Sequence, residues 1–427
     1  MMSSLRSSFR RLLSQTKHLT SLVNRGHHEQ ALLFFSQMFS SPDLTLDPFA
    51  FPLALKSSAA LRLPNAVASI HAHATKAGLL PNPFVASSLV DSHGKCAGIA
   101  HARQAFDESP QRNVVVWNAM IALYSRSSDT PSALEIFEVM DVQPNASSYN
   151  SIVAALSESE DDGPYRALHF YRRMRASGLA PNLITVLALL PICVRLGALS
   201  FIKEIHGFAV RGRIYPHPQL GSGFIETYGR CGCLVYARRI FDLMKDKDVV
   251  VWSSLVSAYA FHGNADIAMS VFRWMETEKV QPDGIMFLGI LKACSHSGFA
   301  DDALKYFDIM TDKYGVEASS DHYSCLVDVL SRAGRLKEAY EVLDRMPVKA
   351  TAKAWGALLG ACRSHGEVRL AEIAGRVLFE LEPENAGNYV LLAEAHTEGG
   401  KFERGREVRR EMVERGLKRS PGGQLGI

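Results

Sequence analysis

The apolar residues between Val249 and Asp283 recur at intervals of three and four positions, in two runs separated by a short polar stretch. This spacing predicts two amphipathic helices, because residues three and four apart share one face of a helix. Gly263 and Asn264 predict the turn between the helices, and Pro282 predicts the end of the second helix. The segment therefore predicts a helical hairpin. Its apolar positions are Trp252, Leu255, Val256 and Tyr259 in the first helix and Ala268, Val271, Phe272 and Met275 in the second.

The same pattern recurs along the chain in units of 31 to 37 residues. One comparable segment runs from Val114 to Asn145, and it also opens with three valines and a tryptophan. Helical hairpins repeated at such a period cannot bury their apolar faces alone, so they stack into an α-solenoid. The sequence therefore predicts an all-α fold. The predicted units start near Leu12, Pro48, Pro83, Val114, Ala146, Leu183, Pro218, Val249, Gly284 and Ser320.

Composition narrows the function without identifying one. The net charge of +3, from 47 basic and 44 acidic residues, is too small to indicate a nucleic-acid-binding protein by itself. No apolar run approaches the roughly 18 residues of a membrane-spanning helix, so we expect no membrane association. The seven cysteines form no Cys-x-x-Cys pair, which predicts reduced thiols rather than a disulfide framework.

The N-terminal segment has the composition of an organellar transit peptide. The first 28 residues contain four arginines and one lysine, and the first acidic residue is Glu29. Transit peptides are rich in arginine and serine and poor in acidic residues. We expect residues 1–15 to be a targeting segment for the mitochondrion, because arginine dominates, with the chloroplast as the alternative. A disordered basic terminus or an extension of the first repeat would give the same composition.

Five longer stretches carry a resemblance to a known family. They are SLVDSHGKCAGIAHARQAFDESPQRN (Ser88 to Asn113), VVVWNAMIALYSR (Val114 to Arg126), FIETYGRCGCLVYARRIFDLM (Phe224 to Met244), FLGILKACSHSGFADDALKYFDIM (Phe287 to Met310) and HYSCLVDVLSRAGRLKEAYEVLDRMP (His322 to Pro347). The pattern resembles the plant pentatricopeptide repeat family, in the subclass that mixes standard, long and short motifs. The resemblance covers Leu12 to Gly423. It implies about ten repeats within residues 16–350, stacked as antiparallel helix hairpins into a right-handed superhelix.

The pattern changes after Pro347. Two further helical pairs, from Ala354 to Pro383 and from Asn388 to Gly422, resemble the E-type extension of that family. This extension is more like a tetratricopeptide repeat and is usually interpreted as a protein-docking surface. The resemblance implies an extension over residues 351–423, followed by a short tail over residues 424–427.

Longer members of the family continue into a zinc deaminase, the DYW domain. A zinc deaminase needs a His-x-Glu motif and a Cys-x-x-Cys motif to hold the metal and move protons. The strings from His27 to Glu29 and from His365 to Glu367 have the first spacing, but neither is followed by a Cys-x-x-Cys, and Cys231 and Cys233 have the wrong spacing. We therefore expect a chain without the deaminase domain, with no catalytic residues, no metal and no other cofactor.

In the family, the fifth residue of the first helix and the last residue of the unit read one base of single-stranded RNA. Small hydroxyl, amide and carboxylate groups suit this role, because they form hydrogen bonds without blocking the base. The alternative for any single residue is a helix cap or a solvated polar side chain, but recurrence in six units favours reading. By resemblance, Asn118 with Asn145 and Asn150 with Asn182 are pyrimidine readers, Ser222 with Asp248, Ser253 with Asp283 and Thr16 with Asp47 are guanine readers, and Ser87 with Asn113 is an adenine reader.

The remaining units fit no base rule. Three long units are interpreted as spacers, and the implied target reads G, unknown, A, pyrimidine, pyrimidine, unknown, G, G. Ser324 keeps the hydroxyl of a reader, but its expected closing partner, near Ala350, is not polar. The pairs at the reading positions of the three spacer units are Pro52 with Asn82, Leu187 with His217 and Leu288 with Ser319.

Four basic residues occupy the thirteenth position of their units: Lys95, Arg126, Arg230 and Arg332. Stacking would align them into a stripe able to neutralise RNA phosphates. Basic residues also favour the C-terminal end of a helix, and both explanations can hold together.

The leading hypothesis is a site-recognition factor for cytidine-to-uridine RNA editing in an organelle, which recruits a deaminase or another editing protein in trans through residues 352–423. A role in RNA stability, splicing or translation fits the repeats equally well. A protein-binding scaffold of the tetratricopeptide type is the competing class. A scaffold predicts an inner face rich in large apolar or charged residues, whereas the predicted lining is Asn, Ser, Thr and Asp. An enzyme is the weakest class, since the chain shows no nucleophile, base or metal constellation.

Overall fold

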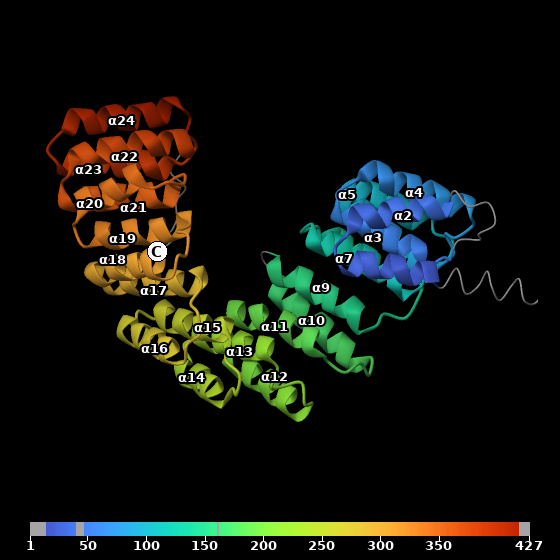
Figure 1. The fold of residues 1–427 in the computed structure, drawn as a ribbon. Helices are drawn as coiled ribbons and strands as arrows, with labels where there is room; N and C mark the ends of the chain where they lie inside the picture. Colours follow the sequence, from blue (N-terminus) through green and yellow to red (C-terminus); the bar gives the residue numbers. More distant parts are fainter. Residues whose placement is uncertain (1–13, 40–46, 160–161, 418–427) are drawn as a thin grey trace, which may run out of the picture. The chain divides into compact units, whose positions relative to one another are not determined.

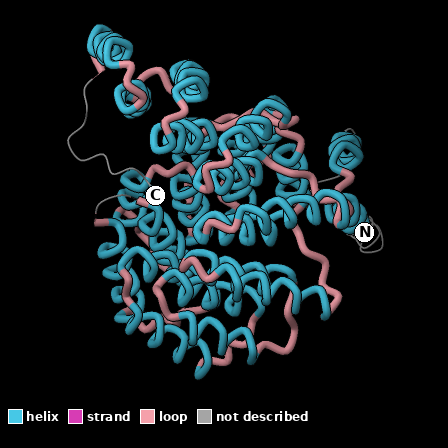
Figure 2. Tube along the Cα trace, turned by 90° about the vertical axis from the view of Figure 1, so that its left-hand side faces the viewer, coloured by secondary structure: helices cyan, strands magenta, loops and turns pink. Residues whose placement is uncertain are grey.

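The structure is a computed structural model that describes residues 14–39, 47–159 and 162–417. Throughout these residues, helices alternate with short loops and no strand occurs (Figure 2). Most of the expected targeting segment, and all of the expected tail over residues 424–427, lie outside the described residues. The chain divides into two compact units, Met1–Leu196 and Gly197–Ile427, which we call unit 1 and unit 2 and of which only the residues given above are described.

Unit 1 is a stack of helical hairpins (Figure 1). A helix over residues 14–24 opens its described part. The helices that follow are α2 (His28–Phe39), α3 (Ala50–Ala60), α4 (Pro64–Lys76), α5 (Pro83–Cys96), α6 (Ile99–Glu108), α7 (Val114–Arg126), α8 (Thr130–Glu138), α9 (Ala146–Glu158), α10 (Gly163–Ala176) and α11 (Leu183–Leu196).

Unit 2 continues the same hairpin pattern to the end of the described chain (Figure 1). Its helices are α12 (Leu199–Arg211), α13 (Pro218–Arg230), α14 (Leu234–Leu243), α15 (Val249–Phe261), α16 (Ala265–Thr277), α17 (Gly284–Ser297), α18 (Ala300–Asp308) with the π-helix η1 (Ile309–Lys313), α19 (Ser320–Arg332), α20 (Leu336–Arg345), α21 (Ala352–His365), α22 (Val368–Leu381), α23 (Ala386–Glu398) and α24 (Phe402–Glu414).

Within each unit, the first helices of successive hairpins form one layer. In unit 1, α3, α5, α7, α9 and α11 contact each other in sequence, and in unit 2 the same holds from α13 to α23 by odd numbers. The second helices pack on the first helices of their own and the following hairpin. The prediction of an all-α fold of stacked antiparallel hairpins is therefore confirmed within each unit.

The sequence pattern located the hairpins closely. Eight of the predicted unit starts, from Pro83 to Ser320, are the first residues of helices, and the unit expected at Pro48 opens with α3 two residues later. Gly263 adopts a φ of 69° in the turn between α15 and α16, a left-handed conformation that glycine adopts without a steric cost. Leu12 lies outside the described residues.

The core lies between the two layers and repeats in phase. Trp117 and Trp252 occupy the same repeat position and are 4% and 1% exposed, so the prediction that they belong to the inter-helix core is confirmed. Ala133 and Ala268, at the start of the second helices, are fully buried. A small side chain at this position lets the two helices of a hairpin approach closely.

Two glycines in the first-helix layer set the spacing between neighbouring hairpins. Gly94 and Gly229 both stand at the twelfth position of their units. A Cβ atom added at Gly94 would lie 2.5 Å from a terminal methyl group of Leu123, and one added at Gly229 would lie 2.4 Å from Cβ and 3.1 Å from Cα of Ala258. A side chain at Gly229 would therefore clash with the next first helix itself, whereas a side chain at Gly94 would require the Leu123 side chain to move.

Candidate nucleic-acid interface

In several repeats the side chain of the closing residue caps the next first helix. Asn113 Oδ1 accepts hydrogen bonds from the backbone N–H groups of Val115 and Val116, at 3.0 and 3.2 Å. Asp283 Oδ1 accepts one from Met286 at 2.9 Å. These bonds satisfy N–H groups that have no partner inside the helix. The same role falls to Asn82, Asn145, Asp248 and Thr351.

Capping holds the side chain of the closing residue in place but does not use all of its hydrogen-bonding atoms. In the asparagines the cap engages Oδ1, so the amide nitrogen remains for another partner. In Asp248 and Asp283 the cap engages one carboxylate oxygen, so the second oxygen remains. The helix-cap explanation is therefore correct for these residues, and it leaves a donor or an acceptor available at each of them.

Three of the predicted reader pairs are joined by a hydrogen bond in unit 1. Asn118 Nδ2 donates to Asn145 Oδ1 at 3.1 Å, and Asn150 Nδ2 donates to Asn182 Oδ1 at 3.2 Å. Thr16 Oγ1 donates to Asp47 Oδ2 at 2.9 Å. The fifth residue of one first helix thus lies directly beside the cap of the next, as the phase of the repeats predicts.

A third polar side chain joins each of the two Asn pairs. Ser148 Oγ on α9 donates to Asn118 Oδ1 at 2.6 Å, and Thr185 Oγ1 on α11 donates to Asn150 Oδ1 at 2.8 Å. Both hydroxyl residues are fully buried. Their role was not predicted from the sequence, although each stands at the third position after a closing asparagine.

The Ser pairs are arranged differently. Ser253 Oγ donates to the carbonyl of Val249 at 2.8 Å, and Ser222 Oγ donates to that of Gln219 at 3.1 Å. Ser87 likewise donates to Phe84, at 3.3 Å. Within the described residues, none of these serines is hydrogen-bonded to its closing partner. Each hydroxyl therefore uses its hydrogen on its own helix and keeps only acceptor capacity.

The expectation for Ser324 requires a correction. Its closing partner is polar: Ser324 Oγ and Thr351 Oγ1 lie 2.9 Å apart, and Thr351 also caps α21 by accepting from Ala354 N. The unit therefore closes one residue after Ala350. Ser324 itself is 3% exposed and donates to the carbonyl of Ser320.

In six repeats an exposed apolar side chain, which was not predicted as a site residue from the sequence, stands at the second position of the repeat. At the second position, Phe84 is 54% exposed, Val250 53% and Ile285 64%. The sequence signal that could have identified this position is an apolar residue that is expected neither in the core nor in a turn. Such side chains offer a surface on which the faces of bases can lie. The full series is Phe49, Phe84, Val115, Ile184, Val250 and Ile285.

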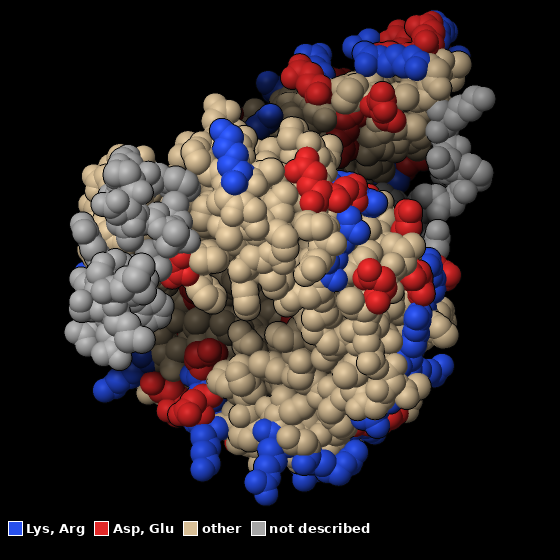
Figure 3. All heavy atoms as spheres, turned by 90° about the vertical axis from the view of Figure 1, so that its right-hand side faces the viewer, with Lys and Arg blue, Asp and Glu red and all other residues tan. Residues whose placement is uncertain are grey.

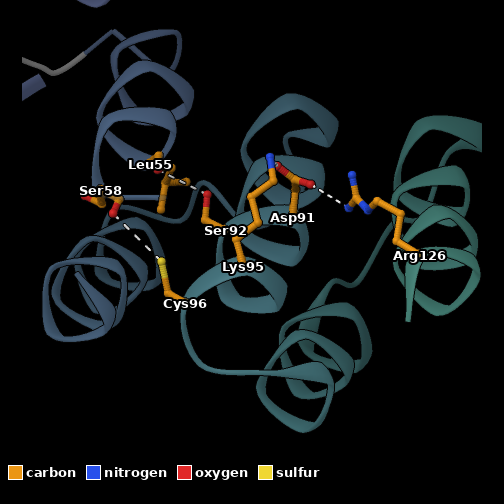
Figure 4. A network of polar contacts seen from close by, with 7 residues as sticks. All are labelled: Leu55, Ser58, Asp91, Ser92, Lys95, Cys96 and Arg126. Carbon is orange, nitrogen blue, oxygen red and sulfur yellow. Dashed lines mark hydrogen bonds and ion pairs between the residues drawn. The ribbon is translucent and has the colours of Figure 1, made fainter. Parts of the chain in front are cut away.

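The four basic residues of the predicted stripe are half exposed, and each one pairs with an acidic residue. Asp91 lies between Lys95 Nζ at 2.6 Å and Arg126 Nη2 at 3.0 Å (Figure 4). Arg230 pairs with Glu226 at 3.7 Å. Arg332 pairs with Asp328 at 3.1 Å.

These ion pairs reduce the local positive charge of the predicted stripe. On the face shown in Figure 3, acidic side chains lie beside basic ones in several places. Exposed pairs of this kind are weak, so an RNA phosphate could exchange with a carboxylate. Phosphate contact by the four residues stays a prediction.

A histidine cluster lies between α4, α5 and α6. His71 Nδ1 and His93 Nε2 are 3.1 Å apart, and His71 Nε2 lies 3.2 Å from Glu108. With His101 they line a hollow of about 300 Å³. Burial, with the nearby His71 and His101, lowers the pKa of His93 to about 4. Within the described part of the chain, no group of three or more His, Cys, Asp or Glu side chains is arranged to hold a metal ion.

The remaining features concern packing. Cys193 and Cys294 share one repeat position and are buried, and burial raises the pKa of the Cys294 thiol to about 12.

The described helices include none with the length and apolar character needed to cross a bilayer.

Comparison with known proteins gives four kinds of family match. Residues 115–142, 222–249 and 285–314 match a PPR repeat, residues 314–347 match a second PPR repeat description, residues 239–297 match a pentatricopeptide repeat domain, and residues 365–424 match an E motif.

The chain is also similar over nearly its whole length to individual proteins. A putative pentatricopeptide repeat-containing protein of Arabidopsis thaliana is 55% identical, over 99% of this chain and 98% of its own length. A second putative member from the same plant is 33% identical, over 95% of this chain and 64% of its own length. This chain thus spans less than two thirds of the second relative.

Among solved structures, the pentatricopeptide repeat protein PPR10 in complex with an 18-nt psaJ RNA element matches with a TM-score of 0.74 at 18% identity, over 96% of this chain and 62% of PPR10. PPR10 from maize, in another crystal structure, matches with a TM-score of 0.67 at 20% identity, over 96% of this chain and 59% of PPR10. At this identity the likeness concerns the fold.

Proposed function

Because the chain belongs to the pentatricopeptide repeat family, with an E-type extension, we propose that it binds single-stranded RNA and reads about one nucleotide per repeat. The observation that carries the proposal is the recurrence of one polar arrangement. In two successive repeats the fifth residue of the first helix is hydrogen-bonded to the residue that closes the repeat, as Asn118 is to Asn145 and Asn150 to Asn182. Thr16 with Asp47 and Ser324 with Thr351 make the same kind of contact. Stacked repeats place such pairs at a regular interval, which suits an unpaired strand.

The neighbouring exposed side chains complete the site that we propose. The polar pair forms hydrogen bonds with the edge of a base, and the apolar side chain at the second position, such as Val250 or Ile285, contacts its face. The basic residues at the thirteenth position contact phosphates. PPR10 was solved in complex with an RNA element, and we extend RNA binding to this chain through the repeats that the two share.

We further propose that the RNA is an organellar transcript and that the chain marks a site for cytidine-to-uridine editing. The E motif at residues 365–424 supports this assignment. In this proposal, residues 352–423 recruit a deaminase or another editing protein in trans. The arginine-rich N-terminal composition favours the mitochondrion over the chloroplast.

A selection experiment tests RNA reading. The purified full chain is mixed with a degenerate single-stranded RNA pool, and the fraction shifted in a gel is sequenced. We expect enrichment of the order G, any, A, pyrimidine, pyrimidine, any, G, G. Binding without sequence preference, or no binding, contradicts the proposal and favours a protein-binding scaffold.

A matched pair of variants assigns the signal to a reader. Ser253 and the neighbouring Ser254 both donate to a carbonyl four residues earlier, at 2.8 Å, but only Ser253 is at the reading position. We expect Ser253→Ala to weaken the preference for guanine at one nucleotide and Ser254→Ala to leave the selected sequence unchanged. Equal effects of the two variants would show that the assigned phase is wrong.

The editing role needs a test in the plant. Sequencing of organellar RNA from plants that lack the protein should show loss of conversion at one or a few cytidines. The full chain should restore conversion. A chain in which exposed residues of α23 and α24 are substituted should not restore it. Unchanged editing throughout the organellar transcripts would leave RNA binding standing and remove the editing role.

A further inference from the structure

The two buried hydroxyls of unit 1 occupy a place that the other described repeats fill with apolar residues, except for His322 in α19. Ser148 and Thr185 stand at the third position of their repeats, next to the two reader pairs that consist of two asparagines. The corresponding residues behind the serine readers are Val116, Val251 and Met286. The hydroxyl therefore accompanies the Asn pairs and no serine pair among the described repeats.

The hydrogen bonds around Ser148 determine which way each amide faces. Asn145 accepts from the backbone N–H groups of Ser147 and Ser148, at 3.0 and 3.1 Å, so the accepting atom must be its oxygen. The atom of Asn118 that faces this oxygen must then be nitrogen, at 3.1 Å. The other atom of the Asn118 amide is therefore the oxygen, and it accepts from Ser148 Oγ at 2.6 Å.

The next repeat has the same arrangement. Asn182 Oδ1 accepts from the backbone N–H of Thr185 at 3.0 Å and from Asn150 Nδ2 at 3.2 Å. Asn150 Oδ1 accepts from Thr185 Oγ1 at 2.8 Å. In both repeats the orientation of the amide of the fifth residue thus follows from a series of hydrogen bonds that begins at the backbone N–H groups of the following helix.

This arrangement leaves the two pairs with unused donors. In each pair both side-chain oxygens already accept hydrogen bonds, whereas N–H groups remain on both amide nitrogens. We infer that Ser148 and Thr185 are positioning residues that hold the reader amides with their N–H groups toward the RNA, so that these two repeats select bases whose edges offer acceptors. The inference rests on the proposed function. Without the hydroxyl, each of these amides keeps its hydrogen bond to Asn145 or Asn182 but loses the second one, so its N–H groups are held less firmly toward the RNA.

The test compares base preference at single nucleotides. The full chain, Ser148→Ala and Thr185→Val are each selected against the same degenerate RNA pool. Each substitution should lower the pyrimidine preference at one nucleotide by roughly 2- to 12-fold, the equivalent of one hydrogen bond, and leave the other nucleotides unchanged. Thr185→Val keeps the side-chain shape, and Ser148→Thr should retain the preference because it keeps the hydroxyl.

Ser147→Ala is the matched control, because it removes the neighbouring exposed hydroxyl and keeps the backbone bond to Asn145. A lower Tm with uniformly weaker binding and unchanged base preference would mean that Ser148 and Thr185 only cap helices, and would overturn the inference. Unchanged selection by both variants would overturn it as well. If the unsubstituted chain selects no sequence, the proposed function itself fails.

Discussion

The reader pairs of two asparagines in unit 1 and the pair of Ser253 and Asp283 in unit 2 differ in their hydrogen bonds. In unit 1, Asn118 and Asn145 are joined to each other and to the hydroxyl of Ser148. In unit 2, Ser253 donates to its own helix and Asp283 caps the next one, with no hydrogen bond between the two side chains. The same repeat positions therefore carry a closed network of amides in two repeats of unit 1 and two separate acceptors in the Ser253 repeat of unit 2. Ser87 in unit 1 is arranged like Ser253, because it also donates to its own helix.

This difference relates the chemistry of a pair to the bases that it can recognise. The Asn pair has N–H groups to spare, so it suits the acceptors on a pyrimidine edge. The Ser and Asp pair has lone pairs to spare, so it suits the N–H groups on the edge of guanine. Helix capping is common to both arrangements, and capping by itself therefore does not distinguish them.

The largest expected effect comes from converting one arrangement into the other. In Asn118→Ser with Asn150→Ser, each side chain becomes too short to bridge the cap and the third-position hydroxyl. We expect the preference at two adjacent nucleotides to shift from pyrimidine toward purine, by about 10-fold or more at each. Selection from a degenerate RNA pool measures the shift. Binding of the original sequence unchanged would show that the repeats are assigned in the wrong phase.

The close packing of the first helices gives a second difference between unit 1 and unit 2, in how well each tolerates a side chain at the twelfth position of a repeat. In unit 2, a Cβ atom at position 229 meets the backbone and Cβ of Ala258, which cannot move without shifting α15. In unit 1, a Cβ atom at position 94 meets the end of the Leu123 side chain, which can rotate. We expect Gly229→Ala to destabilise the protein by about 1–3 kcal/mol and Gly94→Ala to be close to neutral, because alanine also favours the helix.

Urea unfolding of both variants measures this difference. Each substitution replaces a glycine at the same repeat position by the same residue, so the two serve as controls for each other. Equal losses of stability would mean that the first helices of both units tolerate the added carbon in the same way.

The helices were predictable from the sequence because their signals are local. Proline or valine at the first position, an Asn or Asp before it and an apolar period of 3.6 identify the start of α5, α7 and α15 without knowledge of the fold. The reader positions followed from the repeat phase. For the same reason, Trp117 and Trp252 could be assigned to the core.

The contacts that complete the site were not predictable, because they connect residues of neighbouring repeats. The bond from Ser148 to Asn118 crosses 30 residues, and the pair of Arg126 with Asp91 crosses 35. Their formation depends on the side-chain directions of two helices at once. Thr351 was missed for a simpler reason, since the last repeat closes one residue later than expected.

A pH-dependent effect on stability is expected from His93 in unit 1, in addition to effects of the same sign from His206 and His396 in unit 2, whose pKa burial also lowers. The pKa of His93 is lowered from 6.5 to about 4 by burial and by the neighbouring histidines, with Glu108 acting in the opposite direction. The unfolded chain therefore binds a proton that the folded chain excludes between about pH 6.5 and 4. The contribution of His93 to stability is present above pH 6.5 and is lost as the pH falls through this range.

Denaturant unfolding at several pH values measures this contribution. We expect His93→Gln to flatten the dependence on pH by up to about 1.4 kcal/mol per pH unit, the value for one proton. His73→Gln, which removes an exposed imidazole from α4, is the control. A dependence on pH that is equally steep in His93→Gln would exclude His93 as its source.

The smallest expected effect concerns the ion pairs of the basic stripe, where the units again differ. Asp91 in unit 1 pairs with two basic residues, Lys95 and Arg126, whereas Glu226 in unit 2 pairs with Arg230 alone. Asp91→Asn therefore releases two positive charges and Glu226→Gln releases one. If these residues contact phosphates, RNA affinity at low salt should rise by a few-fold in Asp91→Asn and by less in Glu226→Gln.

Titrations of RNA binding at several salt concentrations measure the number of phosphate contacts directly. Each additional contact steepens the dependence of log affinity on log salt by about 0.7 for a single strand. Asp91→Asn should therefore steepen it about twice as much as Glu226→Gln, at a stability cost of only ~0.2–1 kcal/mol because the pairs are exposed. If neither substitution changes the slope, the phosphates do not contact the residues at the thirteenth position. The four basic residues would then be explained only by the preference of basic residues for the C-terminal end of a helix.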